Sequence, residues 1–255
     1  MNRILCAMTL VIMIAAYHAA NAENLWIGLR AGPSVPRLSG GNNEVSRGYS
    51  SIMAPNLGVT MEHFLTEQFS VQCEVDYSGQ VGERNGLQPI TIEQEGLPQM
   101  PPGQYFYGDF KNKSILYYLE IPAMAKYHWG DSDHWRYFVE GGPYLGFLLS
   151  AEQRTRGESR LYLDQNRTPL AIEGQELPPV SFDANTDVKS DLKEVNVGIT
   201  AGVGVEYMIN QGNQIFLDIR GEYGLRSVQK NTAMDGSSNT GAAVFSLGYK
   251  FVFGR

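Results

Sequence analysis

Hydrophobic and polar residues alternate along residues 113–150, and this alternation is the strongest pattern in the chain. Every second residue of the first half is apolar or aromatic: Ile115, Tyr117, Leu119, Ile121, Ala123, Ala125, Tyr127 and Trp129. The interleaved positions include Glu120, Lys126 and His128, and a polar break at residues 130–134 precedes a second run at residues 135–149. Because successive side chains of a β-strand point to opposite faces, the pattern predicts two long antiparallel strands joined by a tight turn.

The same alternation predicts six further strands, and the connections between strands alternate in length. The strands are expected at residues 25–33, 52–64, 69–79, 192–209, 214–228 and 243–253. Short turns are expected at residues 65–68, 130–134 and 210–213. Longer polar segments occupy residues 40–51, 81–112, 152–191 and 229–239, and the second of these is rich in Gly, Pro, Gln and Glu. We expect residues 81–112 to form a long loop, with at most short structure near residues 104–110.

The alternating connection lengths decide between a soluble and a membrane-embedded architecture. A soluble sandwich would bury the apolar face and has no reason to keep every second connection short. A bacterial outer-membrane barrel has short turns on the periplasmic side and long loops outside. An even number of strands closes such a barrel without a free edge. The sequence therefore predicts an all-β fold, an eight-stranded antiparallel up-and-down transmembrane β-barrel, with aromatic residues near strand ends at the membrane interfaces.

In such a barrel the interleaved polar positions point into the lumen. The charged residues expected there are Arg30, Glu62, Glu74, Asp76, Glu120, Lys126, Arg136, Glu140, Glu206, Asp218, Arg220, Glu222 and Lys250. Both signs are present, and an unpaired buried charge is very costly, so we expect an ion-paired plug and no open channel. Pro122 within a strand predicts a bulge or a local kink.

The N-terminal residues predict an export signal. Arg3 precedes an apolar run at residues 4–17, and the small residues 20–22 fit a cleavage site. We expect residues 1–22, including Cys6, to be removed, leaving residues 23–255 as one barrel domain. The mature chain would hold 19 basic and 27 acidic residues, a net charge of −8. An acidic chain without a basic stripe is not expected to bind nucleic acid, and Cys73 alone cannot form an internal disulfide.

Catalytic and metal-binding patterns are weak. His63, His128 and His134 have no metal-ligand spacing, and a Gly-x-Ser-x-Gly motif is absent. Glu120 and Glu140 lie on adjacent strands and both point inward, but basic residues on the same strands favour a structural ion network over a catalytic pair. We expect no enzyme activity, no catalytic residues, no cofactor and no metal.

Several motifs resemble those of the PorT-like outer-membrane β-barrel family, also described as porin family proteins. They are Gly-Leu-Arg-Ala-Gly at residues 28–32, Leu-Glu-Ile-Pro at 119–122, Gly-Gly-Pro-Tyr-Leu-Gly at 141–146 and Gly-Val-Gly-Val-Glu-Tyr at 202–207. The resemblance covers essentially the whole mature chain and implies an outer-membrane barrel, without assigning a role. The namesake of the family takes part in protein secretion by the type IX pathway. The chain departs from common barrels at its end, where residues 254–255 follow the terminal aromatic Phe253.

These observations predict a protein of the outer membrane of a Gram-negative bacterium, surrounded by outer-membrane lipid. The leading hypothesis is a structural, partner-binding or assembly role carried by the external segments 81–112 and 152–191, with other envelope or secretion proteins as partners. Two alternatives stay open: a narrow porin for small solutes, and an accessory component of protein secretion.

Overall fold

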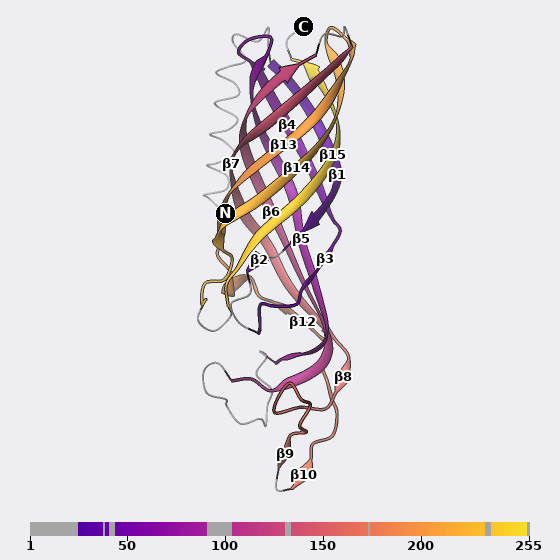
Figure 1. Ribbon diagram of the computed structural model, residues 1–255, viewed down its shortest axis with the longest axis vertical. Helices are drawn as coiled ribbons and strands as arrows, with labels where there is room; N and C mark the ends of the chain where they lie inside the picture. The colour runs from indigo at the N-terminus through magenta and orange to yellow at the C-terminus, as the bar shows by residue number, and fades with distance from the viewer. Residues whose placement is uncertain are drawn as a thin grey trace.

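Eight long antiparallel strands close into a ring (Figure 1). The computed structural model describes residues 25–37, 39–40, 44–90, 104–130, 134–172, 174–232 and 236–253. The ring strands, in their order around the barrel, are β1 (Leu25–Pro36), β4 (Ala54–Phe64), β5 (Phe69–Pro89), β6 (Tyr107–Trp129), β7 (Trp135–Arg156), β13 (Val195–Asn210), β14 (Asn213–Ser227) and β15 (Ser238–Val252). β15 pairs with β1, so the ring has no free edge. The predicted all-β barrel of eight strands is confirmed.

The outer surface of the ring is apolar. Its exposed large side chains include Leu29, Leu57, Val59, Val139, Leu145, Ile199, Val203, Leu217, Ile219, Phe245 and Leu247. Tyr127, Trp129, Trp135 and Tyr249 are exposed near the strand ends that carry the short turns. An apolar band with aromatic residues at its edge matches the lipid-facing surface of an outer-membrane barrel. Among the described residues, no helix is long and apolar enough to cross a membrane.

The strand ends joined by the three short connections all lie at one end of the barrel, the end at which β15 finishes in Figure 1. The turn between β13 and β14 shows why these residues suit it: the Asn210 side-chain oxygen accepts hydrogen bonds from the Gly212 backbone N–H at 2.9 Å and the Asn213 side-chain nitrogen at 2.8 Å. Asn residues satisfy turn backbone in this way. The longer connections lie at the opposite end, which confirms the predicted alternation and makes that end the extracellular side.

The expected long loop at residues 81–112 is wrong. β5 continues to Pro89 and β6 begins at Tyr107, and their register is continuous from Gly79 opposite Tyr117 to the end of the pair. β7 extends with them to Arg156, so part of the expected loop at 152–191 is also strand. The three strands project beyond the ring as an arm (Figure 1). Polar composition concealed this sheet because one of its faces is in water.

The arm and the neighbouring loops also contain short elements. These are β2 (Ser39–Gly40), β3 (Ser50–Ile52), β8 (Glu158–Ser159), β9 (Ala171–Ile172), β10 (Gln175–Glu176), β11 (Val180–Ser181), β12 (Ala184–Asp187) and the 3₁₀ helix η2 (Lys189–Asp191). β12 pairs with β7, and β8 pairs with β11. We use "arm" below for residues 82–90, 104–114 and 152–187.

The bulge predicted at Pro122 lies elsewhere. Pairing with both neighbouring strands lapses near Pro122, but the register is the same before and after it. The register shift in the β6–β7 pair lies between Tyr117 and Tyr118. Pro lacks an N–H donor, so it interrupts the ladder without inserting a residue. Expectations for residues 1–22 and 254–255 lie outside the described residues.

Candidate functional site

The periplasmic half of the lumen is filled by a network of five side chains, which we call the lower network: Glu62, Lys126, His128, Glu206 and Lys250. Lys126 Nζ lies 3.5 Å from carboxylate oxygens of both Glu62 and Glu206. Lys250 Nζ lies 2.8 Å from Glu206 and also contacts Glu62. All five side chains are almost inaccessible to water. Side chains from four strands are thus joined at one level of the lumen by pairs of opposite charge. Buried ions require such pairing.

Above it lies a second set of paired charges, the central network, which consists of Arg30, Glu74, Asp76, Glu140, Asp218 and Arg220. Arg30 Nη1 donates to Glu74 and to Asp76, each at 2.8 Å. Arg220 Nη2 donates to Glu74 at 2.9 Å. Glu74 belongs to β5 and Arg220 to β14, which are opposite strands of the ring, so this bond spans the lumen. The predicted ion-paired plug is confirmed.

Three expected lumen residues, Arg136, Glu120 and Glu222, behave differently from the rest. Arg136 is partly exposed at the periplasmic rim, where it donates to the Glu67 carbonyl oxygen at 2.6 Å, because its strand has only just begun at Trp135. Its placement in the lumen was therefore wrong. Glu140 joins Arg220 and does not form a pair with Glu120. No described cation lies within salt-bridge distance of Glu120 or Glu222.

Three groups of the lower network have the geometry of metal ligands. One ligand atom each of Glu62, His128 and Glu206 lies within 4.8 Å of the others. His128 Nε2 is 3.0 Å from Glu62 and Nδ1 is 3.4 Å from Glu206. Both carboxylates already pair with Lys126 and Lys250, and a divalent cation there would face two ammonium groups. The cluster is therefore an ion network by its own chemistry, and no metal site is proposed.

Hydrophobic side chains pack together at the extracellular mouth of the barrel. Leu116, Tyr118, Leu148 and Ala151 are buried together, and Val188 and Leu192 from the segment after β12 pack against them. A cavity of about 330 Å³ lies beside this cluster, between the barrel rim and the loops, and Leu116, Val188 and Leu192 also line it. Tyr49, Ser114 and Gln153 are among its polar lining residues. Its volume is at the lower end of the range for small-ligand sites.

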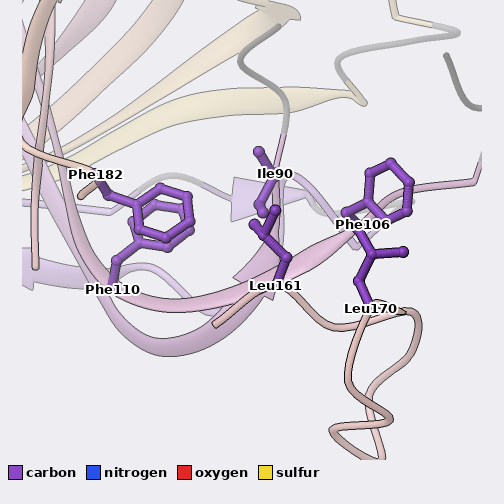
Figure 2. Close-up of a cluster of buried hydrophobic side chains, with 6 residues drawn as sticks. All are labelled: Ile90, Phe106, Phe110, Leu161, Leu170 and Phe182. Atoms are coloured by element: carbon purple, nitrogen blue, oxygen red, sulfur yellow. The ribbon is translucent and has the colours of Figure 1, made fainter. Parts of the chain in front are cut away.

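The arm has a hydrophobic core of its own (Figure 2). The core consists of Ile90, Phe106, Phe110, Leu161, Leu170 and Phe182. The rings of Phe110 and Phe182 stack at 4.4 Å with an interplanar angle of 9°. The backbones of Tyr107 and Tyr162 exchange two hydrogen bonds of 2.8 Å. The residues between β7 and β12 are thereby fixed on one face of the β5–β6 hairpin, and the arm is a packed structure.

The first extracellular loop docks on the arm through polar contacts. Tyr107 donates a hydrogen bond to the Glu44 carboxylate, and Arg84 donates to the Glu44 carbonyl oxygen at 2.6 Å. The hydrogen bond from Tyr107 holds the pKa of Glu44 below its usual value. Asn112 donates to the Tyr49 hydroxyl at 3.0 Å, and burial raises the pKa of that phenol. The arm and this loop therefore form one extracellular unit.

Comparison with known proteins agrees with this architecture. A protein-family model described as "Outer membrane protein beta-barrel domain" matches residues 19–230. The chain belongs to this barrel family. It is an outer-membrane β-barrel protein of the Gram-negative type.

Solved barrels with similar folds have low sequence identity to this outer-membrane barrel. Neisserial surface protein A is 12% identical, with a TM-score of 0.42, and the match covers 91% of this chain and 99% of that one. For outer membrane protein W of Escherichia coli the identity is 17%, the TM-score 0.36, and the coverage 90% and 98%. For OprG of Pseudomonas aeruginosa they are 12%, 0.37, 90% and 97%. No curated protein matches the chain.

Proposed function

We propose that this barrel is a non-enzymatic binding protein that contacts a protein partner of the cell envelope or cell exterior through its arm. The packed core between Phe110 and Phe182 carries this proposal. A connecting loop needs no hydrophobic core, whereas a surface that recognises a partner gains affinity when it is already ordered before binding.

The closed lumen supports the same proposal. The bond between Arg220 and Glu74 crosses the barrel, and the lower network adds a second bridged level. Val188 and Leu192 add apolar packing at the mouth. Each charged side chain of the networks has at least one partner of opposite charge, so ions would have to displace paired groups to pass. The barrel is thus better suited to anchoring the arm than to conducting solutes.

Exposed apolar residues on the arm give a direct test of partner contact. Leu163 is 44% exposed and Ile172 is 45% exposed. A photo-crosslinking amino acid placed at either position in living cells should give protein adducts of discrete mass. The same amino acid at Leu217, on the lipid-facing side of β14, serves as the control. Absence of adducts at both arm positions, or the same adducts at Leu217, would contradict the proposal.

Two other functions have distinct tests. A narrow porin would give a steady single-channel current when the purified protein is inserted into planar bilayers, and we expect none.

The resemblance to PorT-like proteins favours a role in type IX-like secretion as an alternative. Deletion of the gene would then change the set of secreted proteins, whereas a partner-binding role outside secretion would leave that set unchanged.

A further inference from the structure

The uncovered face of the arm carries four basic residues where it leaves the membrane. Outward positions of β6 continue from Tyr117 to Lys113 and Lys111, and their partners on β7 are Arg154 and Arg156. Lys111 and Arg154 are each about half exposed, at 49%. We call these four residues the cationic face. It lies on the same strands as the lipid-facing surface and is separated from it by Ile115, which is buried with Ala54 and Val81.

Like charges are paired directly across the two strands. Lys111 is opposite Arg156, and Lys113 is opposite Arg154, in two successive outward pairs. Like charges directly opposite each other destabilise a sheet. Two such pairs in a row are therefore unfavourable unless an anion lies between them.

Neighbouring carboxylates compensate only part of this charge. Glu83 lies 2.9 Å from Lys111, and Glu152 lies 2.7 Å from Arg154. Arg156 donates to neutral oxygens of Thr155, Ala184 and Asn185. When Asp187, opposite Glu152, is included, these four cations face three carboxylates. Asp109, on the same side of β6, is already paired with Arg167. Lys111 and Arg154 thus form ordinary surface ion pairs. Lys113 and Arg156 have no carboxylate partner within salt-bridge distance among the described residues.

The lower pair of the cationic face, Lys113 and Arg154, lies a few ångströms above the layer of lipid headgroups. Tyr77 and Tyr117 stack at 5.0 Å and an interplanar angle of 16°, and Tyr77 is exposed, as tyrosines at the membrane interface are. Four residues of strand from Tyr117 to Lys113 span about 13 Å, or roughly 10 Å along the membrane normal for a tilt of about 40°. The headgroup layer is about 5–7 Å thick on each side of the hydrocarbon. Long Lys and Arg side chains reach back toward it.

We propose that the cationic face binds the phosphate groups of lipopolysaccharide in the outer leaflet of the outer membrane. Arg154 and Arg156 supply guanidinium groups that bind phosphate oxygens with two parallel hydrogen bonds, and the lysines add point charges. A phosphate between the two cross-strand pairs would cancel the repulsion within each. This lipid contact is separate from the protein partner proposed above, since it uses the opposite face of the arm sheet.

The test is a binding titration of the folded, detergent-solubilised protein with purified lipopolysaccharide. The variant Lys113→Gln/Arg154→Gln removes one cross-strand pair of cations. It should weaken binding about thirtyfold at low salt, because each basic residue near an anionic surface contributes roughly a fivefold gain in affinity. The control is Arg160→Gln, which removes an arm cation of similar exposure, 50%, that pairs with Glu176 in the segment between β7 and β12. The control should bind as the wild type does.

A second measurement does not depend on variants. Enzymatically dephosphorylated lipopolysaccharide should bind the wild-type protein at least tenfold more weakly than the intact lipid, and 0.5 M salt should reduce the difference. Equal affinity for the two lipids would overturn the proposal, as would an unchanged affinity of Lys113→Gln/Arg154→Gln in its heat-modifiable, folded form. Competition by millimolar inorganic phosphate alone would show that free phosphate, and not the lipid, is the ligand.

Discussion

Replacement of Arg220 by Met removes the charge that bridges the barrel, and it should strongly destabilise the fold. The guanidinium lies 2.9 Å from Glu74 and also pairs with Glu140. At about 3 Å and an effective dielectric constant of about 20, one such pair is worth about 5 kcal/mol before desolvation is subtracted. Removal of one partner of a buried pair leaves the other uncompensated and costs about 3–5 kcal/mol. Met fills much of the volume, so this cost would be mainly electrostatic.

The free energy of unfolding can be measured by denaturant titration of the protein folded in lipid vesicles, followed by the fluorescence of Trp129 and Trp135 on the outer surface. Arg226→Gln, on the same strand but exposed, should change it by less than about 0.5 kcal/mol. Glu74→Gln should cost less in the Arg220→Met background than in the wild type, because one of the two cationic partners of Glu74 is already absent and only Arg30 remains. If Arg220→Met lowered the free energy of unfolding by less than about 0.5 kcal/mol, the assignment of a structural plug would be refuted.

Three further predictions concern the arm, the first loop and the wall. Phe182→Ala should lower the local stability of the arm by about 3–5 kcal/mol and make the arm sensitive to protease, while the barrel stays heat-modifiable. The control Ile172→Ala, at an exposed position, should leave the arm resistant to protease. The pKa of Glu44 is lowered in the folded protein, so its contact with Tyr107 should be complete above the usual carboxyl pKa and lost as pH falls below about 4. NMR of the Tyr107 ring should show this transition. The variant Glu44→Gln should abolish it. Gly142→Val should prevent folding, since even a Cβ would lie 1.9 Å from the Ala123 carbonyl oxygen, whereas Gly221→Ala, with nothing within 4 Å, should give a normal gel shift.

The ring could be predicted from the sequence because each wall strand separates lipid from a polar lumen. Apolar and polar residues therefore alternate along each strand, and this alternation alone identified nearly all of the buried charged residues. The pairing between them could not be predicted. Arg220 bonds to Glu74, which is 146 positions away in the chain, and only the closure of the ring brings these two strands opposite each other.

The arm was missed because its core has no local pattern. Ile90, Phe110, Leu161 and Phe182 lie in polar segments that are far apart in the chain, and only the folded arm brings them together. Polar and glycine-rich composition predicts loops, whereas here three strands satisfy one another's backbone groups beyond the membrane. The few aromatic residues in those polar segments were the available signal.

The two faces of the arm sheet account for its orientation outside the cell. One face carries the Phe110–Phe182 stack and is covered by the residues between β7 and β12. The other stays uncovered and carries Lys113 and Arg154 directly above the lipid-facing tyrosines. The β5–β6–β7 register is continuous beyond the shift at Tyr117, so the sheet leaves the ring without a flexible joint at its base. Attraction of the cationic face to headgroup phosphates would then hold the covered side away from the membrane, which leaves Leu163 and Ile172 accessible to a protein partner.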